Sequence, residues 1–273
     1  MACPGAPCPG WIKAKIPEYD VAFVTIDNEK YFYRLSDKAG NKAKTAVFIH
    51  GSGGDSSVWE NQMTGLGMFC RLIVPDLPGH GRSDGNVLAT AKEYAEWLEK
   101  FNAALKLPSF SLIGHSLGGA IAQEYVREYP EKVRSLILTG TGNKFVVLKE
   151  YFRLLQDDFE AAVKTSCINA YSASVSRELY QEGYEMLMRN GKKTLYSDML
   201  ICEQFDSSPW IPSIFVPTLV VCGSDDKIMP RELSRELSSC FPKSKLHIVS
   251  GLGHMVMVEA PDEFNNTVKW FII

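Results

Sequence analysis

A serine flanked by glycines offers the clearest chemistry in this sequence of 273 residues. The segment Gly114-His115-Ser116-Leu117-Gly118 follows the apolar residues 110–113 and precedes a helix-forming stretch. A serine on a sharp turn between a strand and a helix exposes its hydroxyl, and the glycines two residues away avoid side-chain clashes. We therefore predict that Ser116 is a catalytic nucleophile. The amide of Leu117, the next residue, is predicted to donate to the oxyanion that forms when the serine attacks.

A nucleophilic serine needs a histidine to accept its proton and a carboxylate to orient that histidine. In a strand–turn–helix hydrolase the acid and then the histidine follow the serine along the chain. His247 lies inside an apolar run, whereas His254 lies in the loop after that run, so we predict His254 as the general base. The apolar residues 218–221 are followed by Asp225 and Asp226, which cannot both face the histidine, and we predict that Asp226 is the acid.

A sheet must position these side chains. Compact apolar runs recur along the chain, and runs that are apolar on both faces are typical of a parallel sheet covered by helices. The runs are residues 46–49, 72–74, 110–113, 136–138, 218–221 and 246–249. Before them, residues 21–26 and 30–35 are short, β-branched and aromatic, and predict an antiparallel hairpin. The sequence thus predicts a mostly parallel, eight-stranded sheet.

Helical segments alternate with these strands, which places the chain in the α/β class with helices on both faces of the sheet. Thr90 and Glu93 form a capping-box pattern before apolar residues at helical spacing, and predict a helix over residues 91–106. Further helices are expected after Ser116 and near Pro230 and Pro261, since proline suits the first helical turn.

The alternation stops over residues 143–213, which hold helical, aromatic and Met-rich segments but no clear strand. We interpret this stretch as a helical cap inserted between two parts of one α/β core, residues 21–142 and 214–273. Residues 1–20, rich in Cys, Pro and Gly at their start, are predicted to form a flexible tail.

Composition excludes several classes of function. With 29 Lys+Arg against 32 Asp+Glu, the formal charge is −3, and the basic residues are scattered, so we expect no nucleic-acid partner. Proline residues interrupt the longest uncharged stretch, and the start has neither a basic nor an apolar segment of a signal peptide. We therefore expect no membrane association and a cytoplasmic location. The seven cysteines are odd in number and widely spaced, which favours reduced thiols and no metal site.

At this point the chain resembles the α/β-hydrolase fold family. The shared motifs are His50-Gly51, Asp76-Leu77-Pro78-Gly79-His80-Gly81-Arg82-Ser83, the serine segment above, Gly223 with Asp226, Ile228 and Pro230, and Gly253-His254. The resemblance also implies Asp226 as the acid and a cap over the active site. It further implies that the amide of Ser52 is the second oxyanion donor, and that Asp76 to Ser83 mostly brace a turn.

We therefore predict a serine hydrolase that cleaves small to medium carboxylic esters through an acyl-enzyme and requires no cofactor or metal. Phe145, Trp210 and Met255 are expected to contact a small-molecule ester in an apolar cleft, and the protein is expected to be a monomer or a homodimer. A lactonase would need the same residues. Two alternatives stay open. Residues 50–54 resemble the loop of carbon–carbon bond hydrolases that cleave meta-cleavage products, although Gly54 stands where that loop has proline. The other alternative is a receptor-like member that binds a small ligand without turnover.

Overall fold

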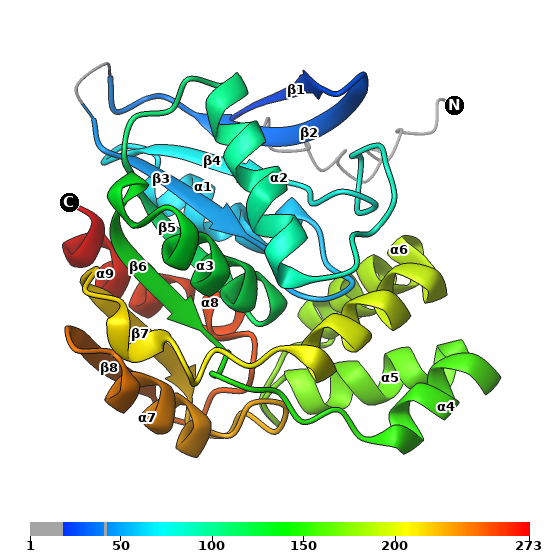
Figure 1. The fold of residues 1–273 in the computed structure, drawn as a ribbon. Coiled ribbons are helices and arrows are strands. Elements are labelled where there is room, and N and C mark those ends of the chain that lie inside the picture. The colour runs from blue at the N-terminus through cyan, green and yellow to red at the C-terminus, as the bar shows by residue number, and fades with distance from the viewer. Residues whose placement is uncertain (1–18, 41–42) are drawn as a thin grey trace, which may run out of the picture.

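The computed structural model describes residues 19–40 and 43–273. Eight strands form one sheet in the order β1-β2-β4-β3-β5-β6-β7-β8 (Figure 1). They are β1 (Asp20–Ile26), β2 (Glu29–Ser36), β3 (Thr45–Ile49), β4 (Arg71–Pro75), β5 (Phe110–His115), β6 (Val133–Thr139), β7 (Thr218–Gly223) and β8 (Ser244–Val249). The pairs β1–β2 and β2–β4 are antiparallel, and β4-β3-β5-β6-β7-β8 are parallel. The predicted mostly parallel, eight-stranded sheet is confirmed.

The apolar runs became strands because both faces of the sheet are buried. Along β3, Val47 and Ile49 belong to one apolar cluster, whereas Ala46 and Phe48 belong to the other. This alternation follows from the two-residue repeat of a strand, which turns successive side chains to opposite faces. A strand in such a position must be apolar throughout.

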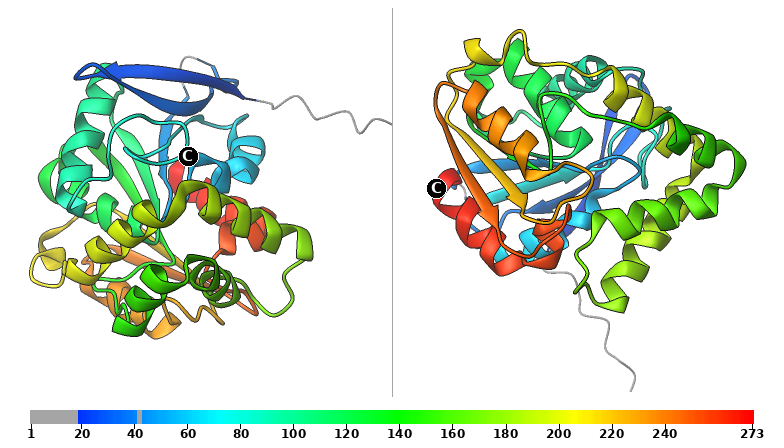
Figure 2. Two further views of the ribbon diagram at one scale, coloured as in Figure 1. Left: turned by 90° about the vertical axis from the view of Figure 1, so that its right-hand side faces the viewer. Right: turned by 90° about the horizontal axis from the view of Figure 1, so that it is seen from below.

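Helices cover both faces of the sheet (Figures 1 and 2). On one face lie α1 (Glu60–Leu66), α8 (Val256–Glu259) and α9 (Pro261–Ile272), and on the other α2 (Ala91–Ala104), α3 (Leu117–Glu128) and α7 (Arg231–Cys240). Short 3₁₀ turns occupy Ser56–Trp59, Pro130–Lys132 and Ile211–Ser213. The capping prediction for α2 is confirmed, because the Thr90 side chain accepts from the Glu93 amide and the Glu93 carboxylate accepts from the Ala89 amide.

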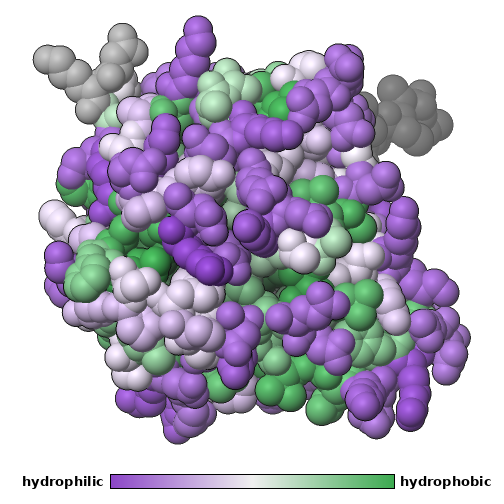
Figure 3. All heavy atoms as spheres, in the orientation of Figure 1, coloured by the Kyte–Doolittle hydropathy of each residue, from purple (hydrophilic) through white to green (hydrophobic). Residues whose placement is uncertain are grey.

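Three helices lie between β6 and β7: α4 (Lys149–Asp157), α5 (Phe159–Ala170) and α6 (Arg177–Gln204). Figure 1 shows them at the lower right, beyond the end of the sheet rather than on either face. Apolar side chains gather on the surface in that region (Figure 3), and Val146, Leu148 and Ile168 are among the exposed large hydrophobic residues.

Of the predicted tail, residues 1–18 lie outside the described part of the chain, and Asp20 already begins β1. The cysteines at positions 3 and 8 also lie outside it, and each of the five cysteines within it is a free thiol. No helix in the described ranges is both long and apolar enough to cross a membrane.

Candidate active site

The turn between β5 and α3 holds Ser116 in a strained conformation. Its φ is 53° and its ψ is −119°, a region that side chains with a Cβ seldom occupy. The flanking glycines allow this geometry. A Cβ on Gly114 would lie 2.2 Å from the Gly118 carbonyl oxygen, and a Cβ on Gly118 would lie 2.4 Å from the Ile49 carbonyl oxygen. The spacing of the motif therefore lets β5, α3 and the end of β3 pack backbone against backbone.

Ser116 faces a cavity of about 430 Å³ between the sheet and helices α4 to α6. The carboxyl ends of the parallel strands meet at one edge of a sheet, which is where ligands bind in open α/β folds. Loops from three strands bring Ser52, Ser116 and His254 to the wall of this cavity. Ser116 is 8% exposed, so its hydroxyl is shielded from bulk water but open to the cavity.

A buried hydrogen bond joins the predicted base and the predicted acid. His254 Nδ1 lies 2.8 Å from Asp226 Oδ2, and the two side chains are 5% and 0% exposed. The other carboxylate oxygen, Asp226 Oδ1, accepts from the amides of Ile228 and Met229 at 2.9 and 2.8 Å. Because a carboxylate accepts, Nδ1 carries the proton, and Nε2 is left with the lone pair that a general base needs.

The loop after β3 lies directly against Ser116. A Cβ on Gly51 would lie 3.0 Å from the Ser116 Cβ, and the Gly54 amide donates to the Gly51 carbonyl at 3.1 Å in a tight turn. His50 Nδ1 bonds the Gly51 carbonyl at 2.9 Å and Nε2 accepts from the Leu77 amide at 3.0 Å, so the ring is a neutral tautomer. Ser52, next in the loop, lines the cavity, and its hydroxyl lies 3.6 Å from the Cys202 sulfur.

Two histidines beneath the site favour the neutral form. Burial, and then the neighbouring His254, lower the pKa of His115 well below its ordinary value. Burial, and then the neighbouring His80, also lower the pKa of His50. His115 Nε2 donates to the His254 carbonyl at 3.2 Å and thus helps to hold the loop that carries the predicted base.

A family model described as the alpha/beta hydrolase fold matches residues 45–261. The chain belongs to the alpha/beta hydrolase fold family. Over 274 residues this alpha/beta hydrolase is 28% identical to a 2-hydroxy-6-oxo-6-phenylhexa-2,4-dienoate hydrolase from Burkholderia cepacia, with 92% of this chain and 95% of the relative covered. The solved structure of a thermophilic esterase is 30% identical and has a TM-score of 0.81, with 93% of this chain and 97% of the esterase covered. An enol-lactonase from Burkholderia xenovorans shares the fold at 20% identity, with a TM-score of 0.84 over 92% of this chain and 99% of the lactonase.

The three side chains expected at the substrate do not all reach the cavity of this alpha/beta hydrolase. Phe145 and Met255 line it, but Trp210 does not. Trp210 packs beneath Arg127, whose guanidinium carbon lies 5.0 Å from the centre of the indole ring, beside a separate hollow. The structure therefore does not bring Trp210 to the cavity with Phe145 and Met255, because the segment that follows α6 turns this ring toward α3.

Much of the cavity wall was not predicted. Apolar side chains from α6 and from the segment before α4 line it, and they are Met186, Leu187, Leu195, Met199, Val146, Val147 and Leu148. Helical spacing of apolar residues was visible in α6, but spacing alone does not show which apolar stripe packs inward and which faces a ligand.

The remaining motif residues brace turns, as the resemblance implied. The Asp76 carboxylate accepts from the amides of Ser56 and Arg82 at 2.7 and 2.8 Å, and the Ser83 hydroxyl donates to the Asp76 carbonyl at 2.7 Å. His247 lies on β8, where its Nε2 is 3.2 Å from a Glu263 carboxylate oxygen on α9, away from the cavity. In the described ranges no group of three or more His, Cys, Asp or Glu side chains could hold a metal ion.

Proposed function

We propose that this alpha/beta hydrolase is a serine esterase that cleaves small to medium carboxylic esters through an acyl-enzyme. The observation that carries the proposal is the buried 2.8 Å contact between His254 and Asp226, with His254 and Ser116 opening on the same cavity. The esterase at 30% identity supports the same chemistry.

Each residue has a defined task in this mechanism. Ser116 Oγ attacks the ester carbonyl carbon while its proton passes to His254 Nε2, and Asp226 stabilises the imidazolium that forms. The amides of Leu117 and Ser52 hold the oxyanion of the tetrahedral intermediate. When the intermediate collapses, the leaving alcohol takes the proton from His254. Water then attacks the acyl-enzyme with His254 as the base, which releases the acid and restores Ser116.

The cavity favours an uncharged, apolar acyl group. Its wall is mainly apolar, with Phe145 and Met255 proposed to contact the substrate. Helices α4 to α6 act as a cap over the core, so residues 143–213 form the cap and residues 21–142 and 214–273 the core. Lys227 is the only lysine among the described residues that line the cavity, no arginine lines it, and the Lys227 side chain is exposed to solvent.

Carbon–carbon bond cleavage is the second candidate. The Burkholderia cepacia relative is named as a hydrolase of 2-hydroxy-6-oxo-6-phenylhexa-2,4-dienoate, a substrate of that reaction class. A dienoate carries a carboxylate, which binds most strongly to a fixed, desolvated cation. An exposed Lys227 is poorly suited to that task, and the ester proposal therefore comes first. A lactone is a cyclic ester and would use the same steps.

Initial rates with p-nitrophenyl esters from acetate to decanoate test the proposal, with a 2-hydroxy-6-oxo-dienoate assayed in parallel. The proposal expects ester turnover that passes through a maximum at medium chain length, and a Ser116→Ala variant without activity. Turnover of the dienoate alone would favour the second candidate. Turnover of neither, with tight binding of a small ligand, would favour a receptor-like role.

A further inference from the structure

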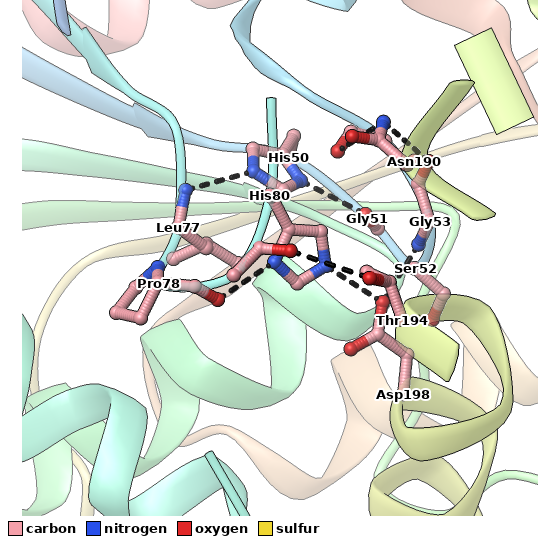
Figure 4. Close-up of polar contacts among 12 residues, drawn as sticks. His50, Gly51, Ser52, Gly53, Leu77, Pro78, His80, Asn190, Thr194 and Asp198 are labelled. Carbon is pink, nitrogen blue, oxygen red and sulfur yellow. Dashed lines mark hydrogen bonds and ion pairs between the residues drawn. The ribbon is translucent and has the colours of Figure 1, made fainter. Parts of the chain in front are cut away.

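Side chains of helix α6 form hydrogen bonds with the backbone of the loop that carries Ser52. Asp198 Oδ2 accepts from the Gly53 amide at 2.7 Å, and Asn190 Nδ2 donates to the carbonyls of Gly53 and Gly54 at 2.9 and 3.1 Å (Figure 4). Both polar backbone groups of Gly53 are therefore bonded to one helix that lies outside the α/β core.

This contact is close because Gly53 has no side chain. Its φ is +62°, and a Cβ there would lie 2.8 Å from Leu187 Cδ2 and 3.0 Å from Leu195 Cδ1. A larger residue would force these two leucine side chains of α6 to move. The position of α6 and the position of residues 51–54 are thus mechanically linked.

The carboxylate that accepts from Gly53 also faces a histidine. His80 Nε2 lies 2.9 Å from Asp198 Oδ2, and both side chains are 0% exposed. His80 Nδ1 faces the Pro78 carbonyl at 2.9 Å, so it must carry a proton. Burial alone would lower the pKa of His80, but the Asp198 charge and its hydrogen bond raise it above its ordinary value. The pair is therefore an imidazolium and a carboxylate, and it ties α6 to the loop after β4.

We propose that Asp198 is a positioning residue for the oxyanion hole: by fixing the Gly53 amide from α6, it sets the direction of the neighbouring Ser52 amide. This inference rests on the proposed function of Ser52. Asp198 does not line the cavity, so it acts through the loop and not on the substrate. A misplacement of about 1 Å at a catalytic group can cost about 10²-fold in rate, which makes such a tether consequential.

A carboxylate at position 198 suits this geometry. A single oxygen, Oδ2, accepts both the Gly53 proton and the His80 Nε2 proton. Without the negative charge, the interaction that raises the pKa of His80 is lost, and a neutral His80 has one proton for two acceptors, the Pro78 carbonyl and residue 198. When that proton stays on Nδ1, the side-chain amide of an Asp198→Asn variant cannot both donate to His80 Nε2 and accept from Gly53 at the Oδ2 position. Asp198→Asn therefore weakens the contacts between α6 and the loop with almost no change in shape.

The test compares Asp198→Asn with Thr194→Val in the full-length enzyme. Thr194 lies one turn earlier on α6, where its hydroxyl donates to the Gly79 carbonyl at 3.3 Å, so its isosteric replacement removes a contact to the core but none to residues 51–54. With p-nitrophenyl butyrate, Asp198→Asn should lower kcat by about 10- to 100-fold and leave KM nearly unchanged, since an oxyanion contact is made only in the transition state. Thr194→Val should keep the wild-type kcat. Equal kcat in Asp198→Asn and wild type, or equal losses in both variants, would overturn the proposal.

Amide hydrogen exchange separates this inference from the proposed function. If the wild type hydrolyses no ester, the proposed function fails, and exchange in the peptide that covers residues 51–54 decides whether the tether exists. Faster exchange in Asp198→Asn but not in Thr194→Val supports the tether, and equal rates overturn it. Should Asp198→Asn fail to fold, Asn190→Ala replaces it, because the partly exposed Asn190 side chain is the other tether from α6 and donates to the Gly53 and Gly54 carbonyls. The same two outcomes then apply.

Discussion

Two adjacent carboxylates follow β7, and their surroundings differ sharply. Asp226 is buried, accepts two backbone amides and lies 2.8 Å from His254, whereas Asp225 is exposed and accepts from the Ser224 hydroxyl at 2.7 Å. A carboxylate that fixes a tautomer must itself be fixed, and only Asp226 meets this condition. From the sequence, the turn after the strand offered these two positions, and the prediction chose Asp226, which the resemblance to the family also implied.

Replacing each carboxylate by its amide tests this assignment. Asp226→Asn should lower kcat by about 10⁴-fold, because the amide leaves His254 in the wrong tautomer. Asp225→Asn, a matched change at the next position, should leave kcat unchanged. Steady-state kinetics with p-nitrophenyl butyrate measures both variants. A large loss in Asp225→Asn with an active Asp226→Asn would contradict the assignment.

The positions of Ser116 and His254 at one cavity could be predicted because their motifs specify backbone geometry, which depends on few neighbours. Trp210 was misplaced because its direction depends on packing against Arg127 on α3, a residue distant in sequence. The bond between Asp198 and Gly53 was also beyond prediction. A single carboxylate among the apolar residues 195, 199, 201 and 202 hinted that it was buried, but not what it met.

Helix α6 changes direction at Gly191, where φ is 84° and ψ is 169°, so two helical stretches meet there. Asn190 ends the first stretch, and Asp198 lies in the second. The bend at Gly191 therefore sets the positions from which Asn190 and Asp198 bond the backbone of residues 53 and 54. The sequence predicted helices over residues 143–213 but not where each helix begins and ends. The apolar faces of these helices pack against one another and line the cavity instead of packing on the sheet, so their pattern is less regular.

Two glycine-to-alanine changes distinguish the effect of backbone strain on stability from the effect of the bend in α6 on catalysis. A Cβ on Gly191 or on Gly40 would meet nothing within 4 Å, and their φ values are +84° and +82°. Each alanine variant should therefore lose about 1–3 kcal/mol of unfolding free energy in urea denaturation, because a residue with a Cβ is strained at a positive φ. Gly191→Ala should also lower kcat, since α6 straightens, while Gly40→Ala, in the loop after β2, should not. Equal kcat in the two variants would show that the bend has no part in catalysis.

The molecule as a whole buries several histidines, and some of them favour the neutral form whereas another favours the charged form. His50 and His115 have lowered pKa values and stay neutral, whereas His80 has a raised pKa and stays charged beside Asp198. An unfolded histidine has a pKa of about 6.5. As the pH falls through this value, the unfolded chain takes up protons that His50 and His115 cannot, and stability is lost. His80 acts in the other direction, because its contribution is complete below pH of about 6.5 and disappears as the pH rises through its folded value.

As the pH falls, His50 and His115 lower the stability of the fold and His80 raises it. The unfolding free energy should therefore decrease as the pH is lowered from 7.5 to 5. Urea denaturation at several pH values measures this slope. His115→Gln, which can still donate to the His254 carbonyl, should make the slope shallower because one of the two neutral histidines is gone. Equal slopes in variant and wild type, or stability that rises toward pH 5, would contradict the assignment of these protonation states.

The strands themselves were predictable from apolar runs, since a sheet buried on both faces leaves a strong signal, but their order in the sheet was not. The size and lining of the cavity were not, because they arise where α4, α5 and α6 meet the ends of the strands. The α/β core thus carries the three residues of the proposed triad, and the inserted helices line the cavity beside Ser116 and His254.

The most direct test of the central claim is rapid mixing with excess p-nitrophenyl butyrate, followed by acid quenching and peptide mass analysis. The account predicts a burst of p-nitrophenol that approaches one equivalent per enzyme when deacylation is the slow step, and a butyryl group on the peptide that contains Ser116. Ser116→Ala should show neither. A butyryl group on another residue, or steady turnover that survives in Ser116→Ala, would contradict the account.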